Sequence, residues 1–394
     1  MLTARRALRV TAMVAVVALA YVGGVVTGVV GSDSPPQKKR GVIDEAADRI
    51  VDKAARPVDR DALERAAVEG MLRALGDRWS TYYGRSEFSS FQAALQGRYS
   101  GVGLWLRGAS RSAAGGGAVE VGSVQPGSPA ERAGMRAGDV LMSVDGADVT
   151  TSDVPTVADL LRGPAPSAVR VSFQRGTSMS TVELDRATFT TQDVTVERLA
   201  GNISRVAVSA FTRGVGRDVQ RALEATADGG ETAGVVLDLR DNPGGLLDEA
   251  VAVASVFLDG GPVVSYERRG KPAQTLDAFE GGDVSTPLVV LVNPSTASAA
   301  EVVAAALQDR NRAVVVGTRT YGKGSVQEPS TLSDGSALEL TVGRYLTPAG
   351  RSLDGVGVEP DVMVPPGEAP EVAEERAIDV LTGLVAALDG TGHG

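Results

Sequence analysis

The chain has 394 residues, of which 43% are apolar, and its 39 basic and 49 acidic side chains leave a net charge of −10. This length accommodates roughly two or three domains with apolar cores, and the negative charge argues against a nucleic-acid-binding protein, which would present a basic surface. The chain has no cysteine and a single histidine, His393, next to the last residue. This excludes disulfides, thiolate catalysis and a zinc site with two or more His or Cys ligands, and it leaves a Ser-His-Asp triad without a credible base, because chain ends are usually frayed.

The N-terminal segment is predicted to be a membrane anchor. Arg5, Arg6 and Arg9 precede an uncharged stretch over residues 10–32, which as a helix would span the hydrocarbon core of about 30 Å. Because basic flanks stay in the cytoplasm, we expect a cytoplasmic stub over 1–9 and a single-pass cell-membrane protein whose remainder is extracytoplasmic. The alternative is a signal peptide cleaved within 28–32, although the apolar stretch is longer than signal peptides require.

A charged, proline-containing linker is expected over residues 33–41. Apolar residues then recur at helical spacing, which predicts two helices interrupted near Pro57 within a helical region over 42–95. Residues 97–187 contain short alternating runs separated by Gly, Pro and Asp, which predicts a small β-rich domain. Its expected elements are strands over 119–124, 140–144 and 169–173 and a short helix over 157–162.

Strand and helix patterns alternate over residues 188–368, which predicts an α/β layered domain. Two of its strands are continuous apolar runs, VVLDL and LVVLV, as buried strands of a parallel sheet require. The expected elements are strands over 234–239, 288–292, 313–316 and 337–342 and helices over 246–258 and 299–308. A last helix is predicted over 369–388, within a C-terminal helix and tail over 369–394.

Ser298 stands between a predicted buried strand and an alanine-rich helix. The pattern Ser298-x-x-Glu301 is a capping box that could begin any helix. The same position also offers catalytic chemistry, because a helix N-terminus presents free backbone N–H groups and the positive end of the helix dipole. The N–H of Ala299 could then stabilise an oxyanion.

Lys323 is one of only five lysines among the 39 basic residues of the chain, and the other 34 are arginine. A general base must lose its proton near neutral pH; arginine cannot do so, whereas burial lowers the pKa of lysines by several units. Lys323 lies between Gly322 and Gly324, which would let another backbone segment approach closely. A solvated loop lysine remains the other interpretation.

A nucleotide site is the competing interpretation of the same segment. Gly317-x-x-x-x-Gly322-Lys323 approximates a P-loop, but Gly324 stands where a Ser or Thr should bind magnesium. Pro329 also falls within the first turns of the helix that should follow, and the segment is predicted to be extracytoplasmic, where ATP is scarce. These departures argue against nucleotide binding.

A third motif, over residues 238–245, runs from a predicted strand end into Asn242-Pro243-Gly244-Gly245. The carboxyl ends of strands are where α/β folds bind ligands, and a glycine N–H there could face a ligand oxygen. An ordinary turn explains the same residues.

The ordered motifs resemble the C-terminal (tail-specific, carboxy-terminal) processing proteases that contain a PDZ domain. The resemblance rests on residues 238–245, 295–301 and 321–327 and on the Ser298-to-Lys323 spacing, and it covers nearly all of the chain after the anchor. Further similar segments, in the helical region and the PDZ domain, are residues 68–83, 99–104, 124–130 and 137–141. The resemblance implies an α/β peptidase core of mixed sheet and helices over 188–368, with an inserted β-rich PDZ domain over 97–187 that follows the N-terminal transmembrane helix and the helical region.

The resemblance also implies roles for individual residues. Ser298 would be the nucleophile, Lys323 the general base and Gln327 the group that orients the lysine. The oxyanion hole would consist of the Ala299 N–H and a glycine N–H from Gly244 or Gly245.

Two more features come from the resemblance. Asp309 occupies a position sometimes proposed for a third catalytic member. The loop of Gly101, Val102, Gly103 and Leu104 would bind the C-terminal carboxylate of a substrate through backbone N–H groups.

The implied protein is an extracytoplasmic serine endopeptidase that cleaves protein substrates near their C-terminus after the PDZ domain has bound the tail. It would need no metal or other cofactor, and no nucleic-acid partner is expected. A homodimer or a regulatory partner remains open. The alternative is a catalytically inactive, membrane-tethered PDZ scaffold that binds protein tails.

Overall fold

The computed structural model describes residues 41–108, 119–227 and 232–391, and the chain divides into two compact units at residue 71. Helix α2 (Val42–Lys53) ends before Pro57 and helix α3 (Arg60–Leu75) begins after it, because proline cannot continue a helix from its interior. The predicted anchor over 10–32 lies outside the described residues. Among the helices in the described ranges, none has both the length and the apolar character needed to cross a membrane.

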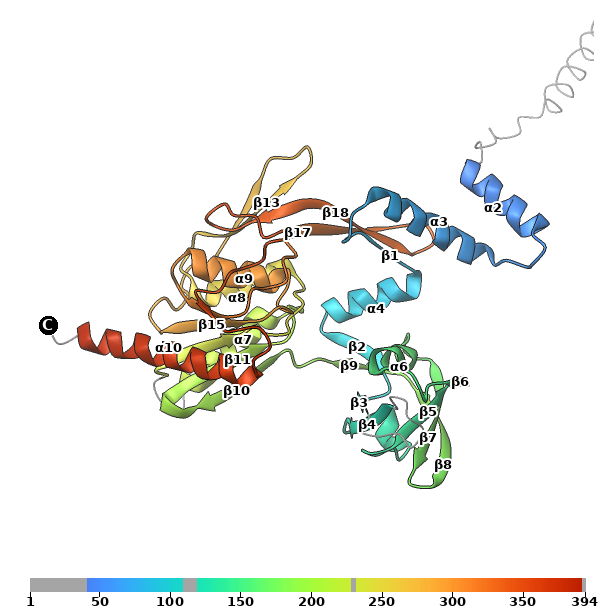
Figure 1. Ribbon diagram of the computed structural model, residues 1–394, viewed down its shortest axis with the longest axis horizontal. Coiled ribbons are helices and arrows are strands. Elements are labelled where there is room, and N and C mark those ends of the chain that lie inside the picture. Colours follow the sequence, from blue (N-terminus) through green and yellow to red (C-terminus); the bar gives the residue numbers. More distant parts are fainter. Residues whose placement is uncertain (1–40, 109–118, 228–231, 392–394) are drawn as a thin grey trace, which may run out of the picture. The chain divides into compact units, whose positions relative to one another are not determined.

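Six strands of the described chain form a sheet in the order β10-β11-β12-β15-β16-β19 (Figure 1). β10 is antiparallel to β11, and all other neighbours are parallel. The central strands β12 (Gly234–Asp238) and β15 (Leu288–Val292) are buried along their whole length, as their continuous apolar sequences require. The others are β10 (Val194–Leu199), β11 (Ile203–Val208), β16 (Val314–Gly317) and β19 (Val362–Met363), with a 3-10 turn η1 (Ala200–Asn202) between the first two.

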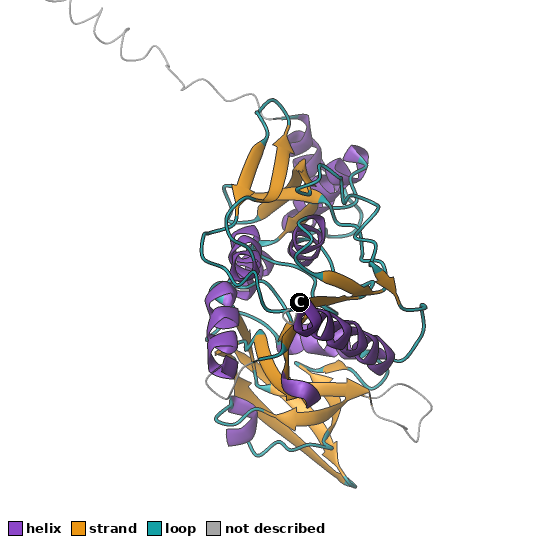
Figure 2. Cartoon of the chain, turned by 90° about the vertical axis from the view of Figure 1, so that its left-hand side faces the viewer, coloured by secondary structure: helices purple, strands orange, loops and turns teal. Residues whose placement is uncertain are grey.

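Helices cover both faces of this sheet. Along β12, Val235 and Leu237 join the core beneath helices α7, α8 and α9, whereas Val236 joins the core beneath α10, because alternate residues of a strand point to opposite faces. Figure 2 shows α10 as the long helix beside the C mark, in front of the strands. The helices are α7 (Val215–Ala227), α8 (Leu247–Phe257), α9 (Ala299–Asp309) and α10 (Pro370–Thr391). The strand-helix alternation predicted from the sequence is therefore present.

An antiparallel sheet of five described strands adjoins this layered core. β18 lies at its centre and pairs with β1, β13 and β17, and β14 extends it beyond β13. β1 comes from the segment that follows α3, so residues 81–83 pair with residues 337–339. The strands are β1 (Thr81–Tyr83), β13 (Pro262–Arg268), β14 (Gln274–Asp277), β17 (Ser325–Thr331) and β18 (Ala337–Leu346).

The β-rich segment forms its own sheet, in the order β3-β4-β5-β7-β8, with β6 beside β5. Its apolar core contains the inward-facing residues Val119, Val121, Leu141 and Val171. Helix α4 (Arg85–Leu95) precedes the segment, and β2 pairs with β9 where the chain enters and leaves it. The elements are β2 (Arg98–Gly101), β3 (Leu104–Gly108), β4 (Val119–Val124), α5 (Pro129–Arg132), β5 (Val140–Val144), β6 (Ala147–Asp148), α6 (Val154–Leu161), β7 (Ala168–Arg175), β8 (Ser178–Asp185) and β9 (Ala187–Thr190).

Candidate active site

Ser298 lies in a strained turn between β15 and α9, at the carboxyl edge of the six-stranded sheet. It is the N-cap residue of α9, with φ 55° and ψ −118°. Non-glycine residues rarely adopt such a conformation, which costs about 1–3 kcal/mol and persists only where surrounding contacts impose it. The turn puts Ser298 at the positive end of the α9 dipole, which favours negative charge on an oxygen atom there.

The carboxylate of Glu301 joins the turn that carries Ser298 to the turn that carries Lys323. One carboxylate oxygen accepts the N–H groups of Ser298 and Lys323, each at 2.8 Å. The other accepts the Gly322 N–H at 2.7 Å and the Thr320 hydroxyl. The side chain is fully buried, and four donors compensate the loss of water around its charge. The sequence showed Glu301 only as a helix-capping residue; its contacts with residues 320–323 depend on the tertiary fold.

Lys323 lies in a glycine-flanked turn between β16 and β17. A Cβ atom on Gly324 would lie 2.1 Å from the backbone nitrogen of Asp354, and Gly322 has φ 87°. Both glycines are therefore required by close backbone packing, as the sequence predicted. The Lys323 Nζ lies 5.4 Å from the centroid of the Trp79 ring. Among the described residues Nζ has no hydrogen bond or ion pair, so the Ser298 hydroxyl and the ammonium group are not in direct contact in this structure.

Gln327 lies on β17, four residues after Lys323. Its amide nitrogen donates to the Ser325 hydroxyl at 2.6 Å and to the Thr341 hydroxyl at 3.4 Å. Gln327 and Lys323, both of which the structure describes, share no hydrogen bond. The orienting role of Gln327 therefore stays a prediction.

The turn that follows β12 packs against the turn that carries Ser298. A Cβ atom on Gly244 would lie 2.8 Å from the Ser298 Cβ and 3.0 Å from the Ala299 nitrogen, whereas one on Gly245 would meet the Phe211 carbonyl oxygen at 2.4 Å. Gly244, with φ 102°, is thus the glycine that lies beside the serine. The Ala299 N–H has no hydrogen-bond acceptor among the described residues.

Asn242 holds this turn in place. Its side chain is fully buried; the amide oxygen accepts the Gly244 N–H at 2.8 Å, and the amide nitrogen donates to the Val208 carbonyl at 2.8 Å. Its own carbonyl accepts the Ala297 N–H at 2.9 Å. Asn242 thereby connects β11, the Gly244 turn and the turn that carries Ser298. Sequence patterns predicted only that Asn242 lies in a turn.

The loop predicted to bind a carboxylate leads into β3, an edge strand of its sheet. The Val102 carbonyl accepts the Ala130 N–H at 3.0 Å, and the Gly103 carbonyl accepts the Gln125 N–H at 2.9 Å. At Gly103, with φ 81°, a Cβ atom would lie 2.2 Å from the Ser128 Cβ. Only glycine fits there, and among the described strands β4 is the one partner of β3, whose outer edge lies next to α6.

Asp309 does not reach this site. It is the last residue of α9, about 16 Å along the helix axis from Ser298. Its carboxylate pairs with Arg351 and accepts the Ala349 N–H at 2.9 Å. The structure therefore does not support a third catalytic role for Asp309.

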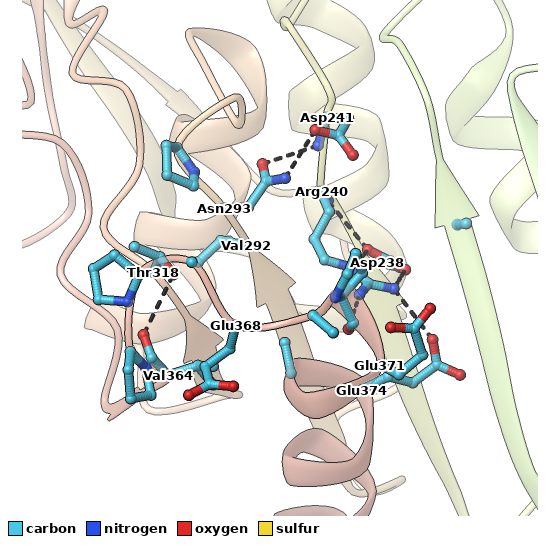
Figure 3. A pocket seen from close by; sticks show the side chains of 18 of the residues that line it. Asp238, Arg240, Asp241, Val292, Asn293, Thr318, Val364, Glu368, Glu371 and Glu374 are labelled. Atoms are coloured by element: carbon cyan, nitrogen blue, oxygen red, sulfur yellow. Dashed lines mark hydrogen bonds and ion pairs between the residues drawn. The ribbon is translucent and has the colours of Figure 1, made fainter. Parts of the chain in front are cut away.

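A cavity of about 560 Å³ lies at the carboxyl ends of β12 and β15, on the side of α10 (Figure 3). Arg240 pairs there with Asp238 at 2.6 Å and with Glu374 of α10 at 3.2 Å, and the hydrogen bond with Asp238 raises the pKa of Arg240. Neither Ser298 nor Lys323 is among the residues that line the cavity. The network therefore attaches α10 to the strand end that precedes the Gly244 turn.

Comparison with known proteins gives a consistent result. Residues 202–364 match the model of peptidase family S41, and residues 120–175 match that of the PDZ domain. A protein of Staphylococcus aureus (strain COL) named "Probable CtpA-like serine protease" is 33% identical over 361 residues, which are 90% of this chain and 70% of that protein. The "Carboxy-terminal processing protease CtpA" of Bacillus subtilis (strain 168) is 30% identical over 350 residues, 88% of this chain and 73% of that protein.

The solved structure of a photosystem II D1 C-terminal processing protease is also similar. It shares 33% sequence identity, with a TM-score of 0.50, over 83% of this chain and 93% of that chain. Together with the family matches, this likeness confirms the predicted combination of a peptidase core of mixed sheets and helices with a PDZ domain.

Proposed function

This chain belongs to peptidase family S41, the C-terminal processing serine proteases, and we infer from its site that it is an endopeptidase with Ser298 as nucleophile and Lys323 as general base. The observation that carries this inference is the buried Glu301 carboxylate, which accepts the backbone N–H groups of both residues. A helix cap would need only the first of these bonds. The second fixes the turn of the base relative to the turn of the nucleophile.

The proposed reaction begins with the neutral amine of Lys323, which takes the proton of the Ser298 hydroxyl as Oγ bonds to the scissile carbonyl carbon. The carbonyl oxygen becomes negatively charged beside the Ala299 N–H and Gly244. The C–N bond then breaks, the amine leaves with a proton from the lysine ammonium, and water hydrolyses the acyl-enzyme. The Gly244 N–H donates to Asn242 in this structure, so an oxyanion would share or displace that acceptor.

The PDZ domain is proposed to bind the free C-terminal tail of the substrate. The edge position of β3 and the glycine-requiring loop before it support this role, since an added strand gives affinity through main-chain hydrogen bonds. A substrate with an amidated C-terminus should have a higher KM than the same substrate with a free carboxylate. Equal KM values would rule out carboxylate recognition.

The catalytic part is proposed to lie outside the cytoplasm, attached by residues 10–32. The uncharged stretch and the arginines before it support this arrangement. Fractionation of cells and digestion of intact cells by an added protease test it. Recovery of the full chain in the soluble cytoplasm would rule it out.

The test of the proposed activity uses the full chain in detergent micelles, an unstructured protein substrate and mass spectrometry of the products. Ser298→Ala and Lys323→Ala should each abolish cleavage. Their matched controls are Ser295→Ala, an exposed serine in the same turn, and Lys271→Ala, an exposed lysine, which should cleave like the parent. Tail binding without cleavage by the parent would instead support the inactive scaffold.

A further inference from the structure

The side chain of Trp79 lies against the inferred catalytic base. Its ring centroid is 5.4 Å from the Lys323 Nζ, within the roughly 6 Å at which a cation is attracted to an aromatic face. The ring also contacts Tyr321, two residues before the lysine, with centroids 5.7 Å apart. Trp79 therefore contacts both an aromatic side chain of the turn that carries the base and the reactive end of the base.

Hydrogen bonds to the antiparallel sheet fix the backbone at Trp79. The backbone N–H of Trp79 donates to the Asp77 carboxylate at 3.2 Å, and this carboxylate also accepts the Ser80 hydroxyl. The Ser80 oxygen in turn accepts the Thr341 N–H of β18 at 3.2 Å. β1 begins at the next residue and pairs with β18. Because β18 also pairs with β17, which begins two residues after Lys323, one sheet supports both partners of the contact.

The proposed reaction creates a positive charge next to the Trp79 ring. When Lys323 takes the proton of Ser298, Nζ becomes an ammonium group, and no described carboxylate is bonded to it. In a Ser-His-Asp triad the aspartate stabilises the corresponding imidazolium. The negatively polarised face of an indole ring offers the same kind of stabilisation to an ammonium group.

We propose that Trp79 is a positioning residue of the peptidase reaction: its ring orients the Lys323 amine and stabilises the charge that this amine gains from the serine proton. The inference rests on the proposed function and adds a residue to it. Removing the ring should lower kcat and leave KM nearly unchanged, because Trp79 acts through the base. It should also move the acidic limb of the pH profile to lower pH, because the ring favours the ammonium form in the free enzyme as well.

Other charged groups near the contact do not produce this shift. The Arg78 guanidinium lies 4.4 Å from the Trp79 ring centroid and stays protonated throughout the range. Burial alone would raise the pKa of Asp77, but hydrogen bonds from Ser80 and Thr341 hold it below its usual range. Glu301 keeps its four donors, and Tyr321 is retained in every variant.

The first experiment measures kcat and KM across the pH range for Trp79→Leu and Trp79→Phe in the full chain. Trp79→Leu should reduce kcat roughly three- to tenfold and move the acidic limb down by about half a pH unit. Trp79→Phe, which keeps an aromatic face, should restore most of both. The control Phe279→Ala removes an aromatic side chain that is 63% exposed and should match the parent. An unmoved acidic limb in Trp79→Leu would overturn the proposal, whatever its kcat.

A second experiment does not need activity. The chain has two tryptophans, so Trp105→Phe leaves Trp79 as the sole indole fluorophore. Its emission should change as Lys323 is titrated, and this change should be absent when Lys323→Met is added. Identical titrations in both proteins would overturn the proposal. Because fluorescence reports the contact without turnover, an inactive parent would count against the proposed function and not against this contact.

Discussion

Replacing Glu301 with glutamine tests whether one buried carboxylate holds the turns of Ser298 and Lys323 together. Glutamine has the same size but presents one acceptor oxygen and one NH₂ group. If its oxygen keeps the N–H groups of Ser298 and Lys323, its NH₂ group faces the N–H of Gly322, which loses its acceptor. An orphaned buried donor costs about 1–3 kcal/mol, and the remaining hydrogen bonds weaken without the charge. We therefore expect a destabilisation of about 2–4 kcal/mol and, because a small displacement of the base is costly, a kcat lowered about a hundredfold.

Calorimetry and steady-state kinetics of the full chain measure these two effects. A multidomain chain has no single two-state unfolding free energy, so the comparison uses the melting temperature of the peptidase transition, which should fall by roughly 5–15 °C. The matched control is Glu359→Gln, which removes a carboxylate that is 51% exposed and paired with Arg319. Its melting temperature should change by less than about 2 °C. A Glu301→Gln protein with the parent's melting temperature and kcat would refute the reasoning.

Three other substitutions test separate parts of the site and fold. Gly244→Ala should reduce kcat by more than about a hundredfold, because its Cβ would overlap the nucleophile turn, whereas Gly270→Ala, at φ 73° in open space, should retain the parent's kcat. Lys323→Arg should keep KM and lose turnover, since a guanidinium cannot take the serine proton; turnover within about tenfold of the parent would contradict the base assignment. Burial alone would raise the pKa of Asp283, but hydrogen bonds from Thr286 and Ser285 outweigh it and lower this pKa to about 2. A depressed folded-state pKa stabilises the protein above the unfolded value of about 3.9 and ceases to do so as the pH falls towards 2, so Asp283→Asn should flatten the decline of melting temperature in that window.

The strands and helices of the layered core could be predicted from the sequence because each has a local sequence pattern. The run LVVLV predicted a strand over 288–292, and the Ser298-x-x-Glu301 cap predicted a helix from residue 299; the structure has β15 over Leu288–Val292 and α9 over Ala299–Asp309. The antiparallel sheet was harder to predict from the sequence. β14 is mostly exposed, and β1 is three residues long and pairs with a strand more than 250 residues later. No local periodicity encodes such a pairing.

The same distinction applies to the site. Ser298 and Lys323 could be predicted as nucleophile and base because each belongs to a short motif, and the motifs occur in a specific order. The contacts of Glu301, Asn242 and Trp79 could not be identified in this way, because each side chain bonds or packs against segments distant in sequence. The positive φ of Ser298 is likewise imposed by neighbouring turns and has no signature in a single serine.

The geometry also explains why the two ends of Lys323, the proposed base, are held by different parts of the fold. The chain passes from the parallel sheet at β16 to the antiparallel sheet at β17, and Lys323 lies at this crossing. Glu301 fixes its backbone to the nucleophile turn, whereas Trp79, attached through β1, contacts its amine. Backbone contacts hold the Gly244 turn against the turn of Ser298 whether the Lys323 amine is protonated or neutral. The alignment of Nζ with Ser298 therefore depends on how the antiparallel sheet meets the parallel one, so changes in the β1–β18 pairing should act on kcat through the base even though they lie outside the nucleophile turn.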